Sequence, residues 1–372
     1  MLVGVPKEIK NREYRVGLTP ASVRELVAGG HKVMVQHNAG YEIGFTNEMY
    51  TAVGAQIIAT ASEIFSAADM IVKVKEPQAV ECAMLRPGQI LYTYLHLAPD
   101  PQQTEALIKS GCIAIAYETV TDEFGGLPLL APMSEVAGRM SIQAGAHALE
   151  MSQGGCGMLL GGVPGVEPAK VTIIGGGVVG TNAARMAVGM GAEVVILDRS
   201  LRRMQQLDDI FQGRVKTVYS TQDAVEEHVL ASDLTVGAVL IPGAAAPKLV
   251  TREMISRMKR GSVLVDVAID QGGCFETSKA TTHENPTYIV DEVVHYCVAN
   301  MPGGVARTST LALNNATLGY ALAIANKGWQ KALRDDKHLL EGLNICEGKV
   351  TYEAVARDQQ LDFVPAHEAV GG

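Results

Sequence analysis

Four polar side chains in this sequence follow short apolar runs that are typical of β-strands. Arg15 comes after "LVGV", Lys75 directly follows "DMIVKV", His96 is in "QILYTYLHL" and Asp270 ends "GSVLVDVAID". In open α/β sheets, ligands bind outside the carboxyl ends of the strands. We therefore expect these four side chains, taken to close their strands, to mark a binding site.

The four residue types suit an enzyme that acts on a 2-oxo or 2-amino acid with a nicotinamide cofactor. The guanidinium of Arg15 can hold a carboxylate with two hydrogen bonds. Lys75 offers a compact positive charge for a carbonyl oxygen, and His96 can exchange protons near neutral pH. Asp270 can activate water or ammonia by accepting a proton.

Each of the four residues also has a plainer interpretation. Taken alone, Arg15 and Lys75 are more often surface charges, His96 could be a buried structural histidine, and Asp270 could organise the turn "QGG". Only their joint placement at strand ends, beside a nucleotide-binding motif, favours the chemical interpretation.

The motif is "KVTIIGGGVVGTNAARMAVGMGAEVVILDRS", in which an apolar strand leads into Gly175-x-Gly177-x-x-Gly180 and a helix of small residues. Gly175 permits a tight turn, Gly177 lets the backbone approach a pyrophosphate, and Gly180 lets helix and strand pack closely. The pyrophosphate would lie at the helix N-terminus, where free N–H groups favour an anion.

Asp198 lies 18 residues after Gly180, at the end of the next predicted strand. A carboxylate there accepts hydrogen bonds from ribose hydroxyls and repels a 2′-phosphate, so NAD is favoured over NADP. Arg199, Arg202 and Arg203 leave NADP open, because arginines at this position can accommodate that phosphate.

The elements that must position these residues alternate between short β-branched runs and longer helical patterns, which is typical of a parallel α/β fold. We predict two Rossmann-like domains with parallel sheets, separated by a cleft. Two long helices, near 130–150 and 307–326, are expected to join them. Residues 1–129 would form the substrate domain, residues 130–306 the NAD-binding domain, and residues 307–372 would return to the first domain, which is thus discontinuous.

Composition narrows the function classes. The 372 residues are 47% hydrophobic, and the net charge of −9 includes no basic block, so nucleic acid and anionic membranes are not expected as partners. Six cysteines lack CxxC pairs and zinc-site spacing, which indicates reduced thiols of a cytoplasmic protein, and nothing requires a metal. No secretory signal is expected. The uncharged run 308–326 contains Asn314 and Asn315, so we predict a buried or hinge helix there instead of a membrane span.

Several motifs together resemble the bacterial alanine dehydrogenases, within the alanine dehydrogenase/pyridine nucleotide transhydrogenase family. They are "GVPKEIKNREYRVGLTP", "IVKVKEP", "TYLHLA", "TIIGGGVVG", "VDVAIDQGG" and "VANMPGGVARTST", and they span the chain in the same order. The resemblance implies a reversible, NAD-dependent oxidative deamination of L-alanine to pyruvate and ammonium by a homohexamer.

The resemblance also implies roles for particular residues. The substrate carboxylate is expected on Arg15 and the pyruvate oxygen near Lys75, while His96 and Asp270 take the acid–base roles. The neighbours of Arg15 in the opening loop, including Glu8 and Glu13, are expected to shape or solvate that loop. Besides the motif glycines, cofactor contacts are implied for Ser134, Val178, Val179, Asp198, Arg203, Ser220, Val239, Leu240, Val267, Ala268, Ile269, Asp270, Lys279, Val298, Ala299, Asn300 and Met301.

Two other functions are compatible with the sequence. The NAD(H)-binding part of a proton-translocating transhydrogenase is similar in both domains, but it serves a membrane partner. The joint presence of Arg15, Lys75, His96 and Asp270 favours a freestanding enzyme over that module. An opine-type or saccharopine-type dehydrogenase would use an amino acid as the nucleophile, and the residues alone accept either amine.

Overall fold

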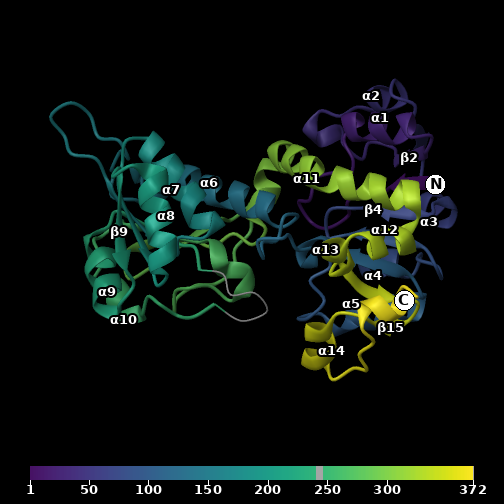
Figure 1. Cartoon of the computed structure of the whole chain (residues 1–372). Helices are drawn as coiled ribbons and strands as arrows, with labels where there is room; N and C mark the ends of the chain where they lie inside the picture. Colours follow the sequence, from purple (N-terminus) through teal and green to yellow (C-terminus); the bar gives the residue numbers. More distant parts are fainter. Residues whose placement is uncertain (240–245, 372) are drawn as a thin grey trace. The chain divides into compact units, whose positions relative to one another are not determined.

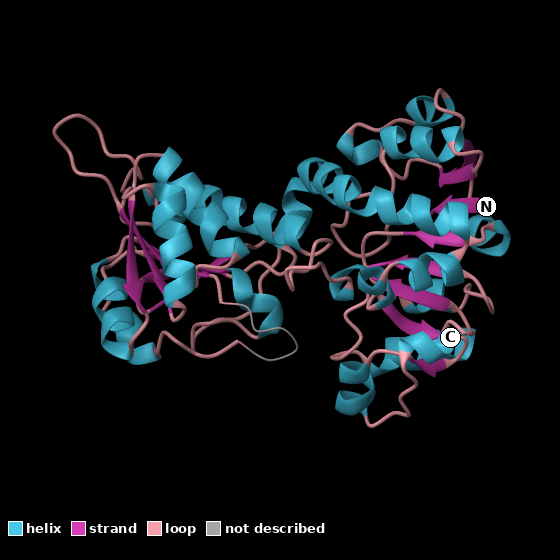
Figure 2. Ribbon diagram, viewed as in Figure 1, coloured by secondary structure: helices cyan, strands magenta, loops and turns pink. Residues whose placement is uncertain are grey.

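The computed structural model describes residues 1–239 and 246–371, and it divides the chain into two compact units (Figure 1). Unit 1 consists of Met1–Met133 and Val305–Gly372, and unit 2 of Ser134–Gly304. Each unit contains one mostly parallel sheet with helices packed against it, as Figure 2 shows. The predicted α/β class with two Rossmann-like sheets is confirmed.

The sheet of unit 1 has eight strands among the described residues, in the order β15-β14-β6-β5-β4-β1-β2-β3. Strands β1 to β6 are parallel, whereas β14 runs antiparallel to β6 and β15 antiparallel to β14. The chain leaves β1 toward β2 on one side and returns to β4 on the other, so the strand order reverses between β1 and β4. The strands are β1 (Leu2–Val5), β2 (Lys32–Gln36), β3 (Gln56–Ile58), β4 (Met70–Val72), β5 (Ile90–Thr93), β6 (Ile113–Ala116), β14 (Leu343–Cys346) and β15 (Lys349–Val350).

The helices of unit 1 begin and end where local chemistry dictates. Thr19 caps α1, because its hydroxyl accepts a hydrogen bond from the N–H of Ser22, and Gly29 ends the helix. The helices are α1 (Pro20–Ala28), α2 (Asn47–Thr51), α3 (Ala61–Ala67), α4 (Ala79–Cys82), α5 (Pro101–Ser110), α11 (Ala306–Lys327), α12 (Trp329–Asp335), α13 (Lys337–Leu340), α14 (Glu353–Gln359) and α15 (Ala366–Ala369), with short 3-10 helices η1 (Tyr41–Ile43) and η2 (Tyr117–Thr119).

The long uncharged segment forms α11, which packs on α1 through buried polar contacts. The side-chain oxygen of Asn314 accepts hydrogen bonds from the N–H of Thr19, at 2.8 Å, and from the hydroxyl of Ser22, at 2.7 Å. Such satisfied polar groups explain why asparagine is tolerated in a buried helix face. Among the described residues, no helix is both long and apolar enough to cross a membrane.

The sheet of unit 2 has seven strands among the described residues, in the order β12-β13-β11-β10-β7-β8-β9, and only β12 is antiparallel. The strand order reverses between β7 and β10. The strands are β7 (Lys170–Ile174), β8 (Glu193–Asp198), β9 (Val215–Tyr219), β10 (Leu234–Gly237), β11 (Val263–Asp266), β12 (Thr287–Val290) and β13 (Val293–Tyr296). The helices are α6 (Ala131–Ala148), which begins in unit 1, α7 (Val178–Gly189), α8 (Leu201–Phe211), α9 (Gln222–Ala231) and α10 (Arg252–Ser256), with η3 (Met151–Gln153), η4 (Val267–Gln271) and η5 (Met301–Val305).

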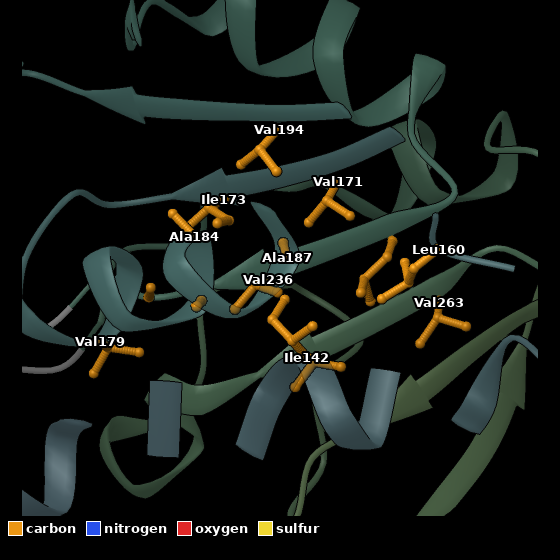
Figure 3. Close-up of a cluster of buried hydrophobic side chains, with 14 of the residues drawn as sticks. Ile142, Leu160, Val171, Ile173, Val179, Ala184, Ala187, Val194, Val236 and Val263 are labelled. Carbon is orange, nitrogen blue, oxygen red and sulfur yellow. The ribbon is translucent and has the colours of Figure 1, made fainter. Parts of the chain in front are cut away.

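Small residues let helices approach the sheet of unit 2 closely. Ala184 and Ala187 of α7 are fully buried in the same core as Ile173 of β7, as Figure 3 shows. Gly145 of α6 lies over β10, where an added Cβ would come within 2.7 Å of the Leu234 side chain. This close packing fixes the N-terminus of α7 relative to the carboxyl end of β7.

Three of the predicted site residues lie beyond their strands instead of closing them. Strands β4, β5 and β11 end at Val72, Thr93 and Asp266, so Lys75, His96 and Asp270 lie in the segments that follow. The predicted strands were too long because apolar residues continue into these segments. For example, His96 has φ 50°, a left-handed conformation that cannot continue a strand.

Candidate active site

The loop between β7 and α7 in unit 2 has the geometry that its glycines predict. Gly175 has φ 104°, and a Cβ there would lie 2.7 Å from the carbonyl oxygen of Ala238. A Cβ on Gly180 would lie only 1.8 Å from the carbonyl oxygen of Gly175, whereas a Cβ on Gly177 would meet nothing within 4 Å. The space beside Gly177, at the start of a twelve-residue helix, therefore suits an anion bound to backbone N–H groups.

The peptide groups of this loop are held by two predicted cofactor residues. An Oδ atom of Asp198 accepts a hydrogen bond from the N–H of Gly176 at 2.7 Å. The guanidinium of Arg203 donates to the carbonyl of Gly176 at 2.6 Å and to the hydroxyl of Thr181 at 2.7 Å. Asp198 and Arg203 thus bind the two successive peptide groups on either side of the Gly176 Cα, which positions the glycine loop. Ser220 is buried, and its N–H donates to the carbonyl of Asp198 at 2.9 Å.

Other predicted cofactor residues follow the carboxyl ends of adjacent parallel strands in the same sheet. Val239 follows β10, the run from Val267 to Asp270 forms η4 after β11, and the run from Val298 to Met301 follows β13. Because these strands are neighbours, the segments after them lie along one edge. Val178 is exposed at the start of α7 and Val179 is buried, while Leu240 lies outside the described residues.

Several of the predicted cofactor residues differ in their burial and in their hydrogen-bond partners. Val298 and Met301 are buried in the unit 2 core, so their side chains already have apolar partners. Asn300 has φ 60°, and its carbonyl accepts a hydrogen bond from Nε2 of His283 at 3.1 Å. Ser134 lies in the first turn of α6 and is partly exposed. Lys279 is exposed, and its N–H donates to the hydroxyl of Tyr288 at 2.7 Å.

Asp266 is a positioning residue that sequence reasoning missed. It ends β11, is fully buried, and accepts hydrogen bonds from the N–H of Ala268 at 3.1 Å, the N–H of Cys274 at 2.8 Å and the hydroxyl of Ser278 at 2.5 Å. Burial raises the pKa of Asp266, even though these hydrogen bonds favour its charged form. Asp266 holds η4 in place, and η4 carries Asp270, which is exposed. The sequence feature that could have identified Asp266 is an aspartate at the end of an apolar strand.

In unit 1, three predicted residues and one unpredicted residue follow neighbouring strands at the same edge. Arg15 follows β1, Lys75 follows β4, His96 follows β5, and Glu118 follows β6, which are adjacent and parallel. This edge includes the reversal of strand order between β1 and β4, where ligands of open α/β sheets bind.

Arg15 is buried with a carboxylate partner from its own loop. Its Nε lies 2.7 Å from Oε1 of Glu13, and its Nη2 lies 2.6 Å from Oε2, while Nη1 lies 3.2 Å from Sδ of Met133. Burial by itself would lower the pKa of Arg15, but the hydrogen bonds and charge of Glu13 outweigh it and raise that pKa. Of the expectation that Glu13 shapes or solvates the loop, the solvated alternative is wrong, because Glu13 is a buried ion-pair partner of Arg15.

Glu8 is likewise buried instead of solvated, because it belongs to a cluster that joins two loops of the site. Nζ of Lys73 lies 3.0 Å from Glu8 and 2.7 Å from Glu81, and all three side chains are buried. A second oxygen of Glu8 accepts from the N–H of Val74 at 2.7 Å. The cluster therefore ties the loop after β1 to the segment after β4, which carries Lys75.

Lys75 is partly buried, with 15% of its side chain exposed, and its Nζ lies 3.3 Å from Oε2 of Glu76. The carboxylate of Glu76 also pairs with Lys10 from the opening loop. Burial alone would raise the pKa of Glu76, but the charges of Lys75 and Lys10 outweigh it and lower that pKa. Lys10 and Lys75 thus share one carboxylate.

His96 is the most accessible of the three predicted residues in unit 1, with 45% of its side chain exposed. Its ring is parallel to that of Tyr94, with centroids 5.7 Å apart, and its Nδ1 lies 3.8 Å from Oε1 of Glu118. The hydroxyl of Tyr94 donates to the carbonyl of Leu129 at 2.6 Å, and burial raises the pKa of Tyr94. Tyr94 therefore stays neutral and gives His96 a fixed apolar face.

No group of three or more His, Cys, Asp or Glu side chains that could hold a metal ion occurs within 1–239 and 246–371. The sheet edge of unit 1 instead carries Arg15, Lys75 and the imidazole of His96. The sheet edge of unit 2 carries the glycine loop and the carboxylate of Asp198.

These features define a class of proteins with two α/β units, of which one has a dinucleotide-type glycine loop and the other an edge lined with charged and titratable side chains. Within that class, the chain belongs to the alanine dehydrogenase/PNT family. Residues 4–137 match the family model for the alanine dehydrogenase/PNT N-terminal domain, and residues 141–353 match that for the C-terminal domain.

Individual relatives are similar over the full length. The chain is 63% identical over 371 residues to the alanine dehydrogenase of Halomonas elongata, with 100% of both chains covered. It is 51% identical to a solved L-alanine dehydrogenase, with a TM-score of 0.94 and coverage of 97% of this chain and 99% of that one. A transhydrogenase structure from Sinorhizobium meliloti is 25% identical, with a TM-score of 0.81 and coverage of 95% and 100%.

Proposed function

We propose that this chain catalyses the reversible oxidative deamination of L-alanine to pyruvate and ammonium, with hydride transfer to NAD. The observation that carries this function is the grouping of Arg15, Lys75 and His96 behind adjacent strands of unit 1. Full-length similarity to alanine dehydrogenases supports the substrate. A cytoplasmic homohexamer is part of the proposal, and the six unpaired cysteines suit a reducing compartment.

The residues of unit 1 are assigned to the substrate. Arg15, kept cationic by Glu13, binds the carboxylate of pyruvate, and Lys75 polarises the carbonyl oxygen. In the reductive direction, ammonia adds to the carbonyl carbon. His96 then donates the proton with which water leaves, so that an imine remains. In the oxidative direction His96 takes this proton back from the attacking water.

The residues of unit 2 are assigned to the cofactor and to a second proton transfer. The loop at Gly177 fits a pyrophosphate because its backbone is open and a helix begins there. NAD, when bound, supplies the hydride acceptor for the oxidation of alanine. The exposed carboxylate of Asp270 accepts a proton from the amine nucleophile, and Asn300 lies in the next strand-end segment of the same sheet.

NAD is proposed over NADP because of the contacts of Asp198 and Arg203. Asp198 ends β8 and places its carboxylate beside the loop, where it would repel a 2′-phosphate. The guanidinium of Arg203 is already bonded to Gly176 and Thr181, so accepting that phosphate would require it to give up these bonds.

A second candidate is an NAD(H)-binding module of a transhydrogenase, which the likeness to the Sinorhizobium meliloti structure favours. Such a module would bind NADH without turning over pyruvate. An opine-type dehydrogenase would need a second amino acid in place of ammonium.

The test is oxidation of NADH by the purified protein with pyruvate and ammonium together, and with each omitted. Activity that requires both supports the proposed reaction, and a preference for NADH over NADPH supports the roles of Asp198 and Arg203. Tight NADH binding without turnover would instead favour the transhydrogenase-like module. Replacement of ammonium by amino acids tests the opine-type alternative.

A further inference from the structure

Glu118, which no sequence pattern singled out, is bound to the backbone that carries His96. It lies in η2 directly after β6, and 11% of its side chain is exposed. Its carboxylate accepts hydrogen bonds from two successive N–H groups, that of Leu95 at 3.2 Å and that of His96 at 2.5 Å. Two backbone donors aimed at one carboxylate form an anion-binding corner.

This corner stabilises a backbone conformation that is otherwise unfavourable. His96 has φ 50°, in the left-handed region that is unfavourable for a residue other than glycine. The carboxylate of Glu118 offsets that cost because charge-assisted hydrogen bonds to backbone N–H groups are strong. The direction in which His96 projects from the end of β5 therefore depends on a residue at the end of β6.

The imidazole ring is oriented by the same carboxylate and by Tyr94. Nδ1 lies 3.8 Å from Oε1 of Glu118, which is an electrostatic contact and too long for a hydrogen bond. One face of the ring is parallel to Tyr94, whose hydroxyl is fixed on Leu129. With Nδ1 directed toward an anion, a proton is favoured on Nδ1, and Nε2 on the opposite edge is left to exchange protons.

We propose that Glu118 is a positioning residue for the proton transfers of His96. It sets the backbone that projects the ring and favours the tautomer in which Nε2 accepts a proton from the attacking water or, as imidazolium, donates one to the departing water. This inference rests on the proposed function, because it gives Glu118 a part in that reaction. A merely structural role, in which Glu118 only joins the segments after β5 and β6, predicts different results in the experiment below.

The experiment combines Glu118→Gln, Glu118→Ala and His96→Ala in the full-length protein, with steady-state NADH oxidation in the presence of pyruvate and ammonium. We expect Glu118→Ala to lower kcat roughly 10- to 100-fold, part of the 10²–10⁴-fold that general acid–base groups contribute, with the KM for pyruvate changed less than about 3-fold. Glu118→Gln keeps an oxygen for the N–H of His96, so its loss should be smaller, roughly 3- to 10-fold.

The decisive comparison is between the double variant His96→Ala/Glu118→Ala and the single variant His96→Ala. If Glu118 acts through His96, Glu118→Ala should lower kcat by less than about 2-fold further when His96 is already alanine. Glu150→Gln is the matched control, because Glu150 lies 3.3 Å from the exposed ring of His147 in unit 2, and it should leave kcat unchanged.

Crystal structures of the two Glu118 variants provide a readout besides activity. We expect the positive φ of His96 to persist in Glu118→Gln and to be lost in Glu118→Ala. An equal loss of kcat in both His96 backgrounds, or an unaltered His96 conformation in Glu118→Ala, would overturn the proposal even if the native protein is fully active. A native protein without turnover would overturn the proposed function instead, which is a distinguishable result.

Discussion

The two candidate sites of this protein are built in different ways. In unit 2, the glycine loop offers backbone groups, and Asp198 and Arg203 bind the N–H and the C=O of its residue Gly176. In unit 1, the edge after β1, β4, β5 and β6 offers side chains, and carboxylates accompany Arg15, Lys75 and His96. A backbone site is sensitive to added atoms, whereas a site of paired side chains is sensitive to lost charges.

That carboxylate pairing has an electrostatic consequence. Arg15 forms a forked ion pair with Glu13, Lys75 faces Glu76, and His96 faces Glu118. Buried or half-buried cations in such a cluster would repel one another without anions between them. The pairing therefore lets an arginine, a lysine and a histidine lie along one edge of the sheet.

The largest effect is expected for His96→Ala, which removes the proposed acid–base group of unit 1. Its kcat should fall roughly 10²- to 10⁴-fold, and NADH affinity should be unchanged, because the glycine loop belongs to unit 2. Stopped-flow turnover and NADH fluorescence titration measure the two quantities. His147→Ala, which removes another exposed histidine beside a carboxylate, is the control and should have no effect. Unaltered turnover of His96→Ala would exclude the assigned role.

The next effect is expected for Arg15→Ala. Loss of a charged hydrogen bond, worth about 1.5–3 kcal/mol, should lower kcat/KM for pyruvate roughly 10- to 150-fold at equal NADH affinity. The same variant leaves the buried carboxylate of Glu13 without its partner Arg15, so the free energy of unfolding should also fall.

The double variant Glu13→Ala/Arg15→Ala separates these two causes. Removal of both charges should recover part of the unfolding free energy, measured by urea denaturation, without recovering the use of pyruvate. If stability and pyruvate use recovered together, Arg15 would have a structural role only.

A smaller effect is expected in the backbone site of unit 2. Gly177→Ala adds a Cβ where nothing lies within 4 Å, so the melting temperature should stay within a few degrees while NADH affinity falls roughly tenfold, about 1.4 kcal/mol. Gly180→Ala is the matched contrast, because its Cβ would collide with the carbonyl of Gly175 and the fold itself should be destabilised. Normal NADH affinity in Gly177→Ala would contradict the pyrophosphate position.

The smallest effect concerns Glu76. Burial alone would raise its pKa in the folded protein, but Lys75 and Lys10 outweigh burial and lower it. A lowered pKa means that its contribution to stability is present above the unfolded-state pKa, near 4.3, and is lost as the pH falls through the folded-state value. The difference in unfolding free energy between the native protein and Glu76→Gln should be no more than about 1 kcal/mol at pH 7 and should shrink toward pH 3. Urea denaturation across that range measures it, and a difference that grows toward low pH would contradict the ion pairs.

Local patterns predicted many elements because their causes are local. Thr19 caps α1 through a contact with Ser22, and the run "EVVILD" forms β8 from end to end. Strands β3, β12, β13, β14 and β15 were not predicted. They are short or lie at or near sheet edges, where the pairing partner and not the apolar pattern defines the strand. The ends of β4, β5 and β11 were placed too late, because apolar residues continue past the last paired residue.

The sequence by itself determined the glycine loop, the acceptor Asp198 and the alternation of strands and helices. Strand-end positions indicated Arg15, Lys75, His96 and Asp270, and the family resemblance implied their roles. These features depend on residue type and short spacing, which the chain carries along its length. Only the tertiary structure decided which side chains are paired. Glu118 contacts His96 across 22 positions and Lys73 contacts Glu8 across 65, because adjacent parallel strands bring distant loops to one edge. Contacts of that kind follow from strand order, and no local pattern specifies it.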